Sequence, residues 1–472
     1  YNIPAVLLLE GALDVPALRR SLNEMVCRHE TLRTGFGLSA TGPAQRVAPP
    51  GDIGLPLIDL SETSTKGSLD RAAQMVQEEV AAVFDLTRPP LFRVKLLRLS
   101  EHRHTLIMTL HRIVCDDWSL AVLTSELGSL YQAFAAGCPS PLPDMPLQHR
   151  DFAVWQRDWL RDGIPEGELR HWRAHLAGAA SLDLPTDRPR TQFQTFRGGR
   201  ECLELSGALM ESLKEMSRYT CQEDIAVGVM ADNRHRDEVA GLIGPVANTL
   251  AMRSHVSPNE RVRDFLKRQR ELALSAYLHQ NVPFEKLLEE LELEADQRPA
   301  LLPQVRFEVR SIPVPLQEWP GVHVSILDQE QAWSRFDLTL SIHETQKGLI
   351  SGIEFNSDLF NRDRIERMLL HYNSVLGSIS ANQDQRIDEI ELLTAKEKKQ
   401  VLVEWNDSSR PHPDSSIVAV FEQQVERTPD KIAIVFEKFS ISYRELNRRA
   451  NRMALRLTTA GVGIETPVAI CA

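Results

Sequence analysis

Apolar and polar residues follow two different periods near the start of the chain. The stretch from Leu7 to Glu10 alternates in a way that favours a β-strand, and Gly11 and Asp14 interrupt it. Apolar residues then recur at helical spacing from Val15 to His29, which predicts an amphipathic helix. The chain therefore opens with a strand and a helix.

A second strand and helix flank a short polar segment. The apolar run from His104 to Leu110 predicts a buried strand. Leu120 to Phe134 has apolar residues at helical spacing, and Ser119 is the expected cap of that helix. Because ligands commonly meet a sheet where its strands end, the loop that begins at His111 is the first candidate for chemistry.

The remaining pattern predicts further helices and two connectors. Val262 to Ala276 is amphipathic, and Pro283 suits the first turn of another helix. Two prolines and alternating charges from Leu182 to Arg190 predict an exposed connector, and the polar stretch from Trp405 to Pro413 predicts a linker. At 472 residues the chain is too long for one ordinary core, so at least two globular units are expected.

Composition excludes several classes of function. A net charge of −11 argues against nucleic acid as the main partner. No secretory leader and no apolar run of about 18 residues is present in the sequence, which favours a cytoplasmic protein without a membrane partner. The cysteines lack the spacing of a metal site or a disulfide framework, so reduced thiols and no metal are expected. They are Cys27, Cys115, Cys138, Cys202, Cys221 and Cys471.

The loop after the buried strand contains His111, Arg112, Asp116 and Asp117. It resembles the HHxxxDG motif of the condensation domains of nonribosomal peptide synthetases, whose second His lies beside the amine that attacks a thioester. Arg112 stands at that His and Asp117 at the Gly. A guanidinium stays protonated at any accessible pH, so Arg112 cannot act as a general base, although it can stabilise an oxyanion or form a salt bridge.

The same resemblance assigns roles to the two other residues of the loop. Asp116 occupies the position at which the family's Asp is mainly architectural and orients the loop through an Arg. His111, without a second His beside it, is expected to be a hydrogen-bonded core histidine. No catalytic residue is therefore assigned, and Arg112 becomes one only if the domain is active.

Further motifs in the same order extend the resemblance over residues 1 to about 385. Arg28 to Phe36 is similar to the family's RHExLRTxF line, and Asp151 to Gln156 to its DFAxWQ line. Gln222 to Gly228 is similar to QEDIxVG, Ile243 to Leu250 to IGxxVNTL, and His279 to Leu287 to HQxxPFExL. Agreement of this many ordered motifs is not expected by chance.

The resemblance implies an α/β fold of two lobes similar to chloramphenicol acetyltransferase. They would form a V-shaped pseudo-dimer whose central tunnel is reached by the phosphopantetheine arms of two carrier proteins. No other cofactor is expected for this part. Ile441 to Ala450 resembles the first core motif of an adenylation domain, and the sequence stops before any phosphate-binding loop. The expected domains are an N-lobe at 1–181, a C-lobe at 182–385, a linker at 386–415 and the start of an adenylation domain at 416–472.

One segment departs from the family. Relatives have a helix of roughly five turns between the counterparts of Arg218 and Tyr219, whereas this sequence continues directly from one to the other. Deleting that helix would leave a hole in a packed core. The other explanation is that the helix is present in the protein and left out of this numbering. We favour that explanation and expect a spatial gap near Ser217 to Tyr219.

The variant loop indicates a function. The HRxxxDD form resembles the X domains of glycopeptide synthetases, which have the condensation fold without condensation activity and dock a cytochrome P450. Related interface domains recruit hydroxylases to carrier-bound amino acids. X domains normally precede a thioesterase, whereas this chain continues into an adenylation domain. We expect a recruitment domain of the X or interface type, whose partners are carrier proteins, the adjacent adenylation domain and a trans-acting oxygenase. The helix from Leu120 to Phe134 is the candidate surface.

Two alternatives remain open at this point. One is an active condensation domain that forms the peptide bond between two carrier-protein thioesters, with Arg112 in place of the usual His. The other is a structural spacer between catalytic domains. An open passage beside residue 112 favours a condensing enzyme, and an exposed patch of apolar and Arg side chains favours a recruiter.

Overall fold

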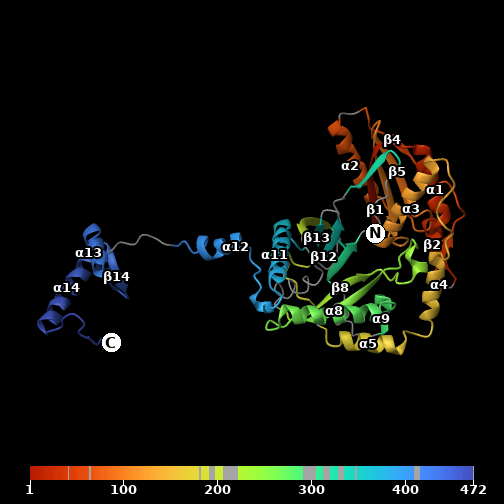
Figure 1. Ribbon diagram of the computed structural model, residues 1–472. Helices are drawn as coiled ribbons and strands as arrows, with labels where there is room; N and C mark the ends of the chain where they lie inside the picture. Colours follow the sequence, from red (N-terminus) through yellow and green to blue (C-terminus); the bar gives the residue numbers. More distant parts are fainter. Residues whose placement is uncertain are drawn as a thin grey trace. The chain divides into compact units, whose positions relative to one another are not determined.

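The computed structural model describes most of the chain, and Figure 1 shows its ribbon. The described residues are 1–40, 42–62, 65–179, 182–190, 197–205, 222–290, 304–311, 319–327, 334–345, 348–408 and 415–470. They divide into two compact units, Tyr1–Ala395 and Lys396–Ala472. No helix among these residues has the length and apolar character that crossing a membrane requires.

The first sheet of the larger unit is built mainly from the N-terminal part of the chain. Its strands, in spatial order, are β11 (Val322–Ile326), β1 (Asn2–Gly11), β6 (Arg103–His111), β5 (Phe92–Ser100) and β4 (Leu57–Asp59). Only the pair β4 and β5 is parallel; the other neighbours are antiparallel. The strands predicted at Leu7 to Glu10 and at His104 to Leu110 are therefore present and adjacent, as β1 and β6.

Helices cover both faces of this sheet, as Figure 1 shows. Leu7 and Leu9 of β1 belong to the core shared with α1 (Val15–Arg28) and α3 (Asp117–Ala135), whereas Val6 packs with α2 (Thr65–Ala81) on the opposite face. This alternation is what a strand buried on both faces requires. The predicted helix at Val15 begins at the Asp14 cap, whose Oδ1 accepts from the N–H of Ala17 at 2.9 Å.

Shorter elements complete this half of the unit. A 3₁₀ turn and a hairpin follow α1, and two helices lead to the second sheet. They are η1 (Glu30–Arg33), β2 (Thr34–Ser39), β3 (Gly42–Val47), α4 (His149–Trp159) and α5 (Glu166–Leu176).

The second sheet lies in the C-terminal part of the unit. Its strands, in spatial order, are β7 (Gly198–Leu205), β13 (Gly348–Asn356), β12 (Leu338–Thr345), β10 (Val305–Ser311), β8 (Asp224–Ala231) and β9 (Asn248–His255). Strand β10 runs parallel to both of its neighbours, and the other pairs are antiparallel. The helices of this half are α7 (Asp237–Ala240), α8 (Val262–Leu278), α9 (Phe284–Glu290) and α11 (Arg362–Ala381).

A strand from the second half of the unit completes the first sheet. Strand β11 pairs antiparallel with β1, with Leu7 opposite Ile326 and Gly11 opposite Val322. Just before β11, the ring of Trp319 stacks on Tyr131 of α3 with centroids 4.5 Å apart. Backbone hydrogen bonds and a buried aromatic pair therefore join the two halves.

The segment after α11 and the smaller unit consist of short elements. They are η2 (Ile387–Glu389), α12 (Ala395–Lys399), η3 (Gln400–Glu404), α13 (Ile417–Arg427), β14 (Ile432–Phe436), β15 (Phe439–Ser442) and α14 (Tyr443–Thr459). Strands β14 and β15 form a hairpin, and α13 packs against α14. The apolar side chains Phe436 and Phe439 of the hairpin are 70% and 75% exposed, so this unit buries little of its own apolar surface.

A cluster of histidines joins α5 to the turn after α8. The ring of His171 stacks on that of His279 at 3.9 Å, and His279 Nδ1 lies 2.7 Å from a carboxylate oxygen of Glu168. Burial, together with the charges of His279 and His175, lowers the pKa of His171 to about 4. His171 is therefore neutral at pH 7 in the folded chain.

This cluster predicts a loss of stability in acid. In the unfolded chain His171 titrates near pH 6.5, so below that pH the unfolded state binds a proton that the folded state does not accept until about pH 4. The free energy of unfolding is therefore highest, as far as His171 is concerned, above about pH 6.5, and it decreases as the pH falls toward 4. After solvent screening, the expected decrease is about 1–2 kcal/mol. Urea unfolding of wild type and His171→Gln between pH 7.5 and 4.5 measures it, and the variant should show a smaller slope. His255→Gln is the control, because His255 is exposed; equal slopes for all three proteins would contradict the prediction.

Candidate functional site

Asp116 forms hydrogen bonds that join the loop after β6 to the start of α3. Its Oδ1 accepts from the backbone N–H of Ser119 at 2.9 Å and from the Ser119 hydroxyl at 2.6 Å. The Ser119 Oγ in turn accepts from the N–H of Asp116 at 3.3 Å. The predicted cap at Ser119 was wrong: Asp116 caps the helix, and Ser119 is the reciprocal partner three residues later. Helix α3 consequently begins at Asp117.

The second half of the unit holds Asp116 in place. The guanidinium of Arg234 donates to both carboxylate oxygens, at 2.7 and 3.0 Å, and the N–H groups of Val246 and Ala247 each donate to Oδ2 at 3.1 Å. Asp116 and Arg234 are 5% and 8% exposed. The expectation that Asp116 orients the loop through an arginine is confirmed, and its oxygens are occupied by donors.

The backbone of Gly244 lies beside the ion pair of Asp116 and Arg234. The Arg234 guanidinium donates to the carbonyl of Gly244 at 3.0 Å, and the Gly244 N–H donates to the Ser119 Oγ at 3.0 Å. A Cβ at residue 244 would lie 2.2 Å from Cδ2 of the His149 ring. A side chain at residue 244 would therefore displace the His149 ring from its place beside the buried ion pair.

His111 is the last residue of β6, and its Nδ1 accepts a hydrogen bond. The N–H of Ile113 donates to Nδ1 at 3.1 Å, which places the ring proton on Nε2. The ring stacks on Tyr1 and meets the edge of Phe84, and burial lowers its pKa. His111 is therefore a neutral, hydrogen-bonded histidine without a nitrogen free to accept a proton.

Arg112 presents a cation without a partner among the described residues. Its backbone N–H donates to the carbonyl of Tyr1 at 2.7 Å, and its half-buried guanidinium has no hydrogen bond or ion pair within the described ranges. The salt bridge considered from the sequence is thus not formed there. Arg112 remains available to a ligand or a partner protein.

Asp117 and Cys115 flank Asp116 in the loop. Asp117 is the first residue of α3, where its negative charge interacts favourably with the helix dipole. Burial, followed by the negative charge of Asp116, raises the pKa of the Cys115 thiol well above its ordinary value. That thiol stays protonated and cannot serve as a nucleophile.

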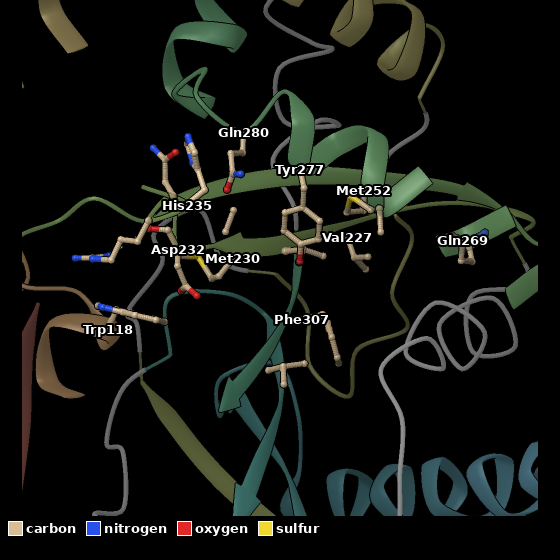
Figure 2. A pocket seen from close by; sticks show the side chains of 16 residues that line it. Trp118, Val227, Met230, Asp232, His235, Met252, Gln269, Tyr277, Gln280 and Phe307 are labelled. Carbon is tan, nitrogen blue, oxygen red and sulfur yellow. Dashed lines mark hydrogen bonds between the residues drawn. The ribbon is translucent and has the colours of Figure 1, made fainter. Parts of the chain in front are cut away.

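A pocket of about 540 Å³ adjoins the loop, and Figure 2 shows the side chains that line it. Trp118 contributes from the start of α3, and its indole N–H donates to the carbonyl of Ala240 at 2.8 Å. The other walls come from β8 and the residues after it, from β9, from α8 and from β10. Arg234 lines the same pocket, so the ion pair that fixes the loop also fixes one wall.

Two ionisable side chains of this pocket could not be inferred as site residues from the sequence. Asp232 directly follows β8 and is exposed toward the pocket, whose walls reduce the solvation of its carboxylate and raise its pKa. Burial, and then the charge of Asp232, raises the pKa of Tyr277 on α8. Lone Asp and Tyr residues carry no motif, and only the fold brings them together. Within the described residues, no group of three or more His, Cys, Asp or Glu side chains is arranged to hold a metal ion.

Comparison with protein families decides the affiliation of the chain. The model of the condensation domain matches residues 1–217 and 214–402, and the model of the AMP-binding enzymes matches residues 421–472. The chain belongs to the condensation domain family. It is a condensation-family domain of a nonribosomal peptide synthetase, followed by the start of an adenylation domain.

Relatives and solved structures agree with this affiliation. Linear gramicidin synthase subunits D and C of Brevibacillus parabrevis are 37% and 38% identical over 495 residues, covering all of this chain. The chain spans 10% and 6% of those proteins. The X-domain from teicoplanin biosynthesis is 27% identical with a TM-score of 0.72, covering 83% of this chain and 93% of that chain. The same X-domain in its complex with OxyB gives a TM-score of 0.71 at 27% identity, covering 83% and 91%.

The expected discontinuity near Ser217 to Tyr219 lies outside the described residues and stays a prediction. The two stretches that match the condensation domain meet at residues 214–217, next to that point. The V-shaped arrangement and the central tunnel also stay predictions.

Proposed function

We propose that this condensation-family domain does not form a peptide bond and instead acts as an X-type or interface-type platform. It would present an amino acid or peptide, held on the phosphopantetheine arm of a carrier protein, to a trans-acting oxygenase such as a cytochrome P450 or a hydroxylase. The loop His111–Asp117 carries the proposal, because His111, Arg112 and Asp116 offer no free proton acceptor at neutral pH.

Each residue of the loop supports this interpretation for a different reason. Arg112 stays protonated, and the His111 Nδ1 lone pair already accepts from the N–H of Ile113. The Asp116 oxygens are occupied by Arg234 and backbone donors. An attacking ammonium must lose a proton before or during acyl transfer, and a positioned base contributes about 10²–10⁴-fold to such steps. A condensing enzyme would lack that contribution here.

Two further observations favour recruitment. A solved relative, the teicoplanin X-domain, forms a complex with OxyB, and its fold covers 83% of this chain. The Arg112 guanidinium is half-buried and has no partner among the described residues, and arginine is enriched among the residues that dominate protein interfaces. An adenylation partner is supported by the match at residues 421–472.

The test is a reconstitution with the complete synthetase module. Oxygenases that the immobilised module captures from the producing cells are identified, purified and assayed for oxidation of the carrier-bound amino acid, with and without this domain. We expect oxidation to require the domain and to weaken in Arg112→Ala. Equal oxidation without the domain, or no oxygenase that binds it, would refute the recruitment function.

An active condensation domain is the second candidate. The intact Asp116 and Arg234 pair, the pocket beside it and the identity of 37–38% to gramicidin synthase subunits favour it. In that case Arg112 would stabilise developing negative charge. Arg112→Ala should then lower single-turnover dipeptide formation by about 10- to 100-fold, the scale for a positioned electrostatic group. Arg112→Lys is the matched control and should retain part of the activity, because it keeps the charge. A structural spacer would show neither activity.

A further inference from the structure

The pocket beside the loop combines apolar walls with a carboxylate that has no partner in the described part of the chain. Within those residues, the Asp232 side chain forms no ion pair and no hydrogen bond. Met230, Met252 and Phe307 supply much of the apolar wall. In Figure 2 the Asp232 carboxylate and the Tyr277 hydroxyl both point toward the side of the pocket on which Phe307 lies. An unpaired carboxylate beside apolar walls favours a cationic ligand.

The arginine that lines the pocket is already paired with another carboxylate. The guanidinium of Arg234 lines the pocket, but its NH1 and NH2 groups donate to both Asp116 oxygens and to the carbonyls of Leu242 and Gly244. Its hydrogen bonds go to Asp116 and not to the Asp232 carboxylate, which has no ion-pair partner among the described residues. An anionic ligand would meet the charge of that carboxylate without compensation.

Other side chains of the pocket suit a donor-rich cation. The aromatic rings of Trp118 and Tyr277 lie in the pocket wall, where ring faces attract ammonium groups. An apolar ligand would leave the Asp232 carboxylate unsatisfied, whereas an ammonium group donates to such an acceptor.

We propose that this pocket is a selectivity subsite for the primary ammonium group of a carrier-bound amino acid, with Asp232 as its counter-ion. The inference rests on the proposed function only in taking the ligand to be the residue that the carrier protein presents. The ammonium group is either the α-amine or a side-chain amine, and matched probes separate the two.

Calorimetric titration of the full chain with small thioesters tests the proposal. The probes are N-acetylcysteamine thioesters of lysine, norleucine, Nα-acetyl-lysine and Nα-acetyl-norleucine, which carry both amines, the α-amine, the side-chain amine and neither. We expect the Kd of the amine that is recognised to rise about tenfold in Asp232→Asn, the scale for one charge-assisted hydrogen bond in a partly open site. The neutral probe should bind weakly and equally to both proteins.

The control variant is Asp237→Asn, which removes the same charge from an exposed position in the first turn of α7, outside the pocket lining. It should leave the Kd of every probe within about twofold of wild type. Equal affinity of wild type and Asp232→Asn for all amines, or a neutral probe that binds as tightly as they do, would overturn the proposal, as would the absence of any binding. These readouts involve neither peptide bond formation nor an oxygenase, so a failure here is distinguishable from a failure of the platform function.

Discussion

Asp116→Ala should lower the free energy of unfolding of the larger unit by about 3–5 kcal/mol, the usual cost of leaving one partner of a buried ion pair alone. The substitution removes the acceptor of the Arg234 guanidinium and of the N–H groups of Val246 and Ala247. It also removes the cap of α3. Urea unfolding followed by tryptophan fluorescence reports on this unit, because every tryptophan except Trp405 belongs to it.

Two comparisons separate the buried pair from a general effect of removing an aspartate. Asp384→Ala breaks an exposed pair with Arg263 and should cost less than about 1 kcal/mol. Asp116→Ala combined with Arg234→Met should be less destabilised than the sum of the two single variants, since it leaves no buried charge unpaired. A loss for Asp116→Ala no larger than that for Asp384→Ala would show that the pair does not hold the two halves together.

Restoring the loop with Arg112→His and Asp117→Gly should not restore condensation. We expect single-turnover dipeptide formation by this double variant to stay at least about 100-fold below that of an active condensation domain, a deficit of more than one catalytic interaction. The physical reason is the pocket. There the Asp232 carboxylate would stabilise the acceptor as an ammonium ion, and a protonated amine has no lone pair with which to attack a thioester.

A triple variant tests the role of the Asp232 carboxylate in this result. Adding Asp232→Asn to the double variant removes the counter-ion and should raise dipeptide formation above that of the double variant. The matched addition of Asp237→Asn, outside the pocket lining, should not. Dipeptide formation by the double variant within about tenfold of an active domain would show that only the base was missing.

The sequence predicted those features of the site that depend on short segments. The buried strand before His111 and the helix after Asp117 follow from local apolar periodicity. The arginine that holds Asp116 was expected from the family resemblance, and Arg234 takes that role. The start of α3 was placed three residues late, because an Asp and a Ser three residues apart can each act as a cap.

Features assembled from distant segments could not be predicted in this way. Strand β11 joins the sheet of β1 although more than 300 residues separate them, and neither sequence specifies its partner. The pocket takes Trp118 from one half of the unit and Asp232 and Tyr277 from the other. An exposed aspartate after a strand looks like any turn residue until the fold shows what surrounds it.

The most direct test of the account is a single-turnover condensation assay of the wild-type module, with the donor and acceptor carrier proteins both loaded. We expect no dipeptide to accumulate and both thioesters to remain intact, because neither His111 nor Arg112 offers a suitable proton acceptor. Dipeptide that forms in the wild type and is lost in Arg112→Ala would contradict this expectation, and would make this domain a condensing enzyme that works through a guanidinium.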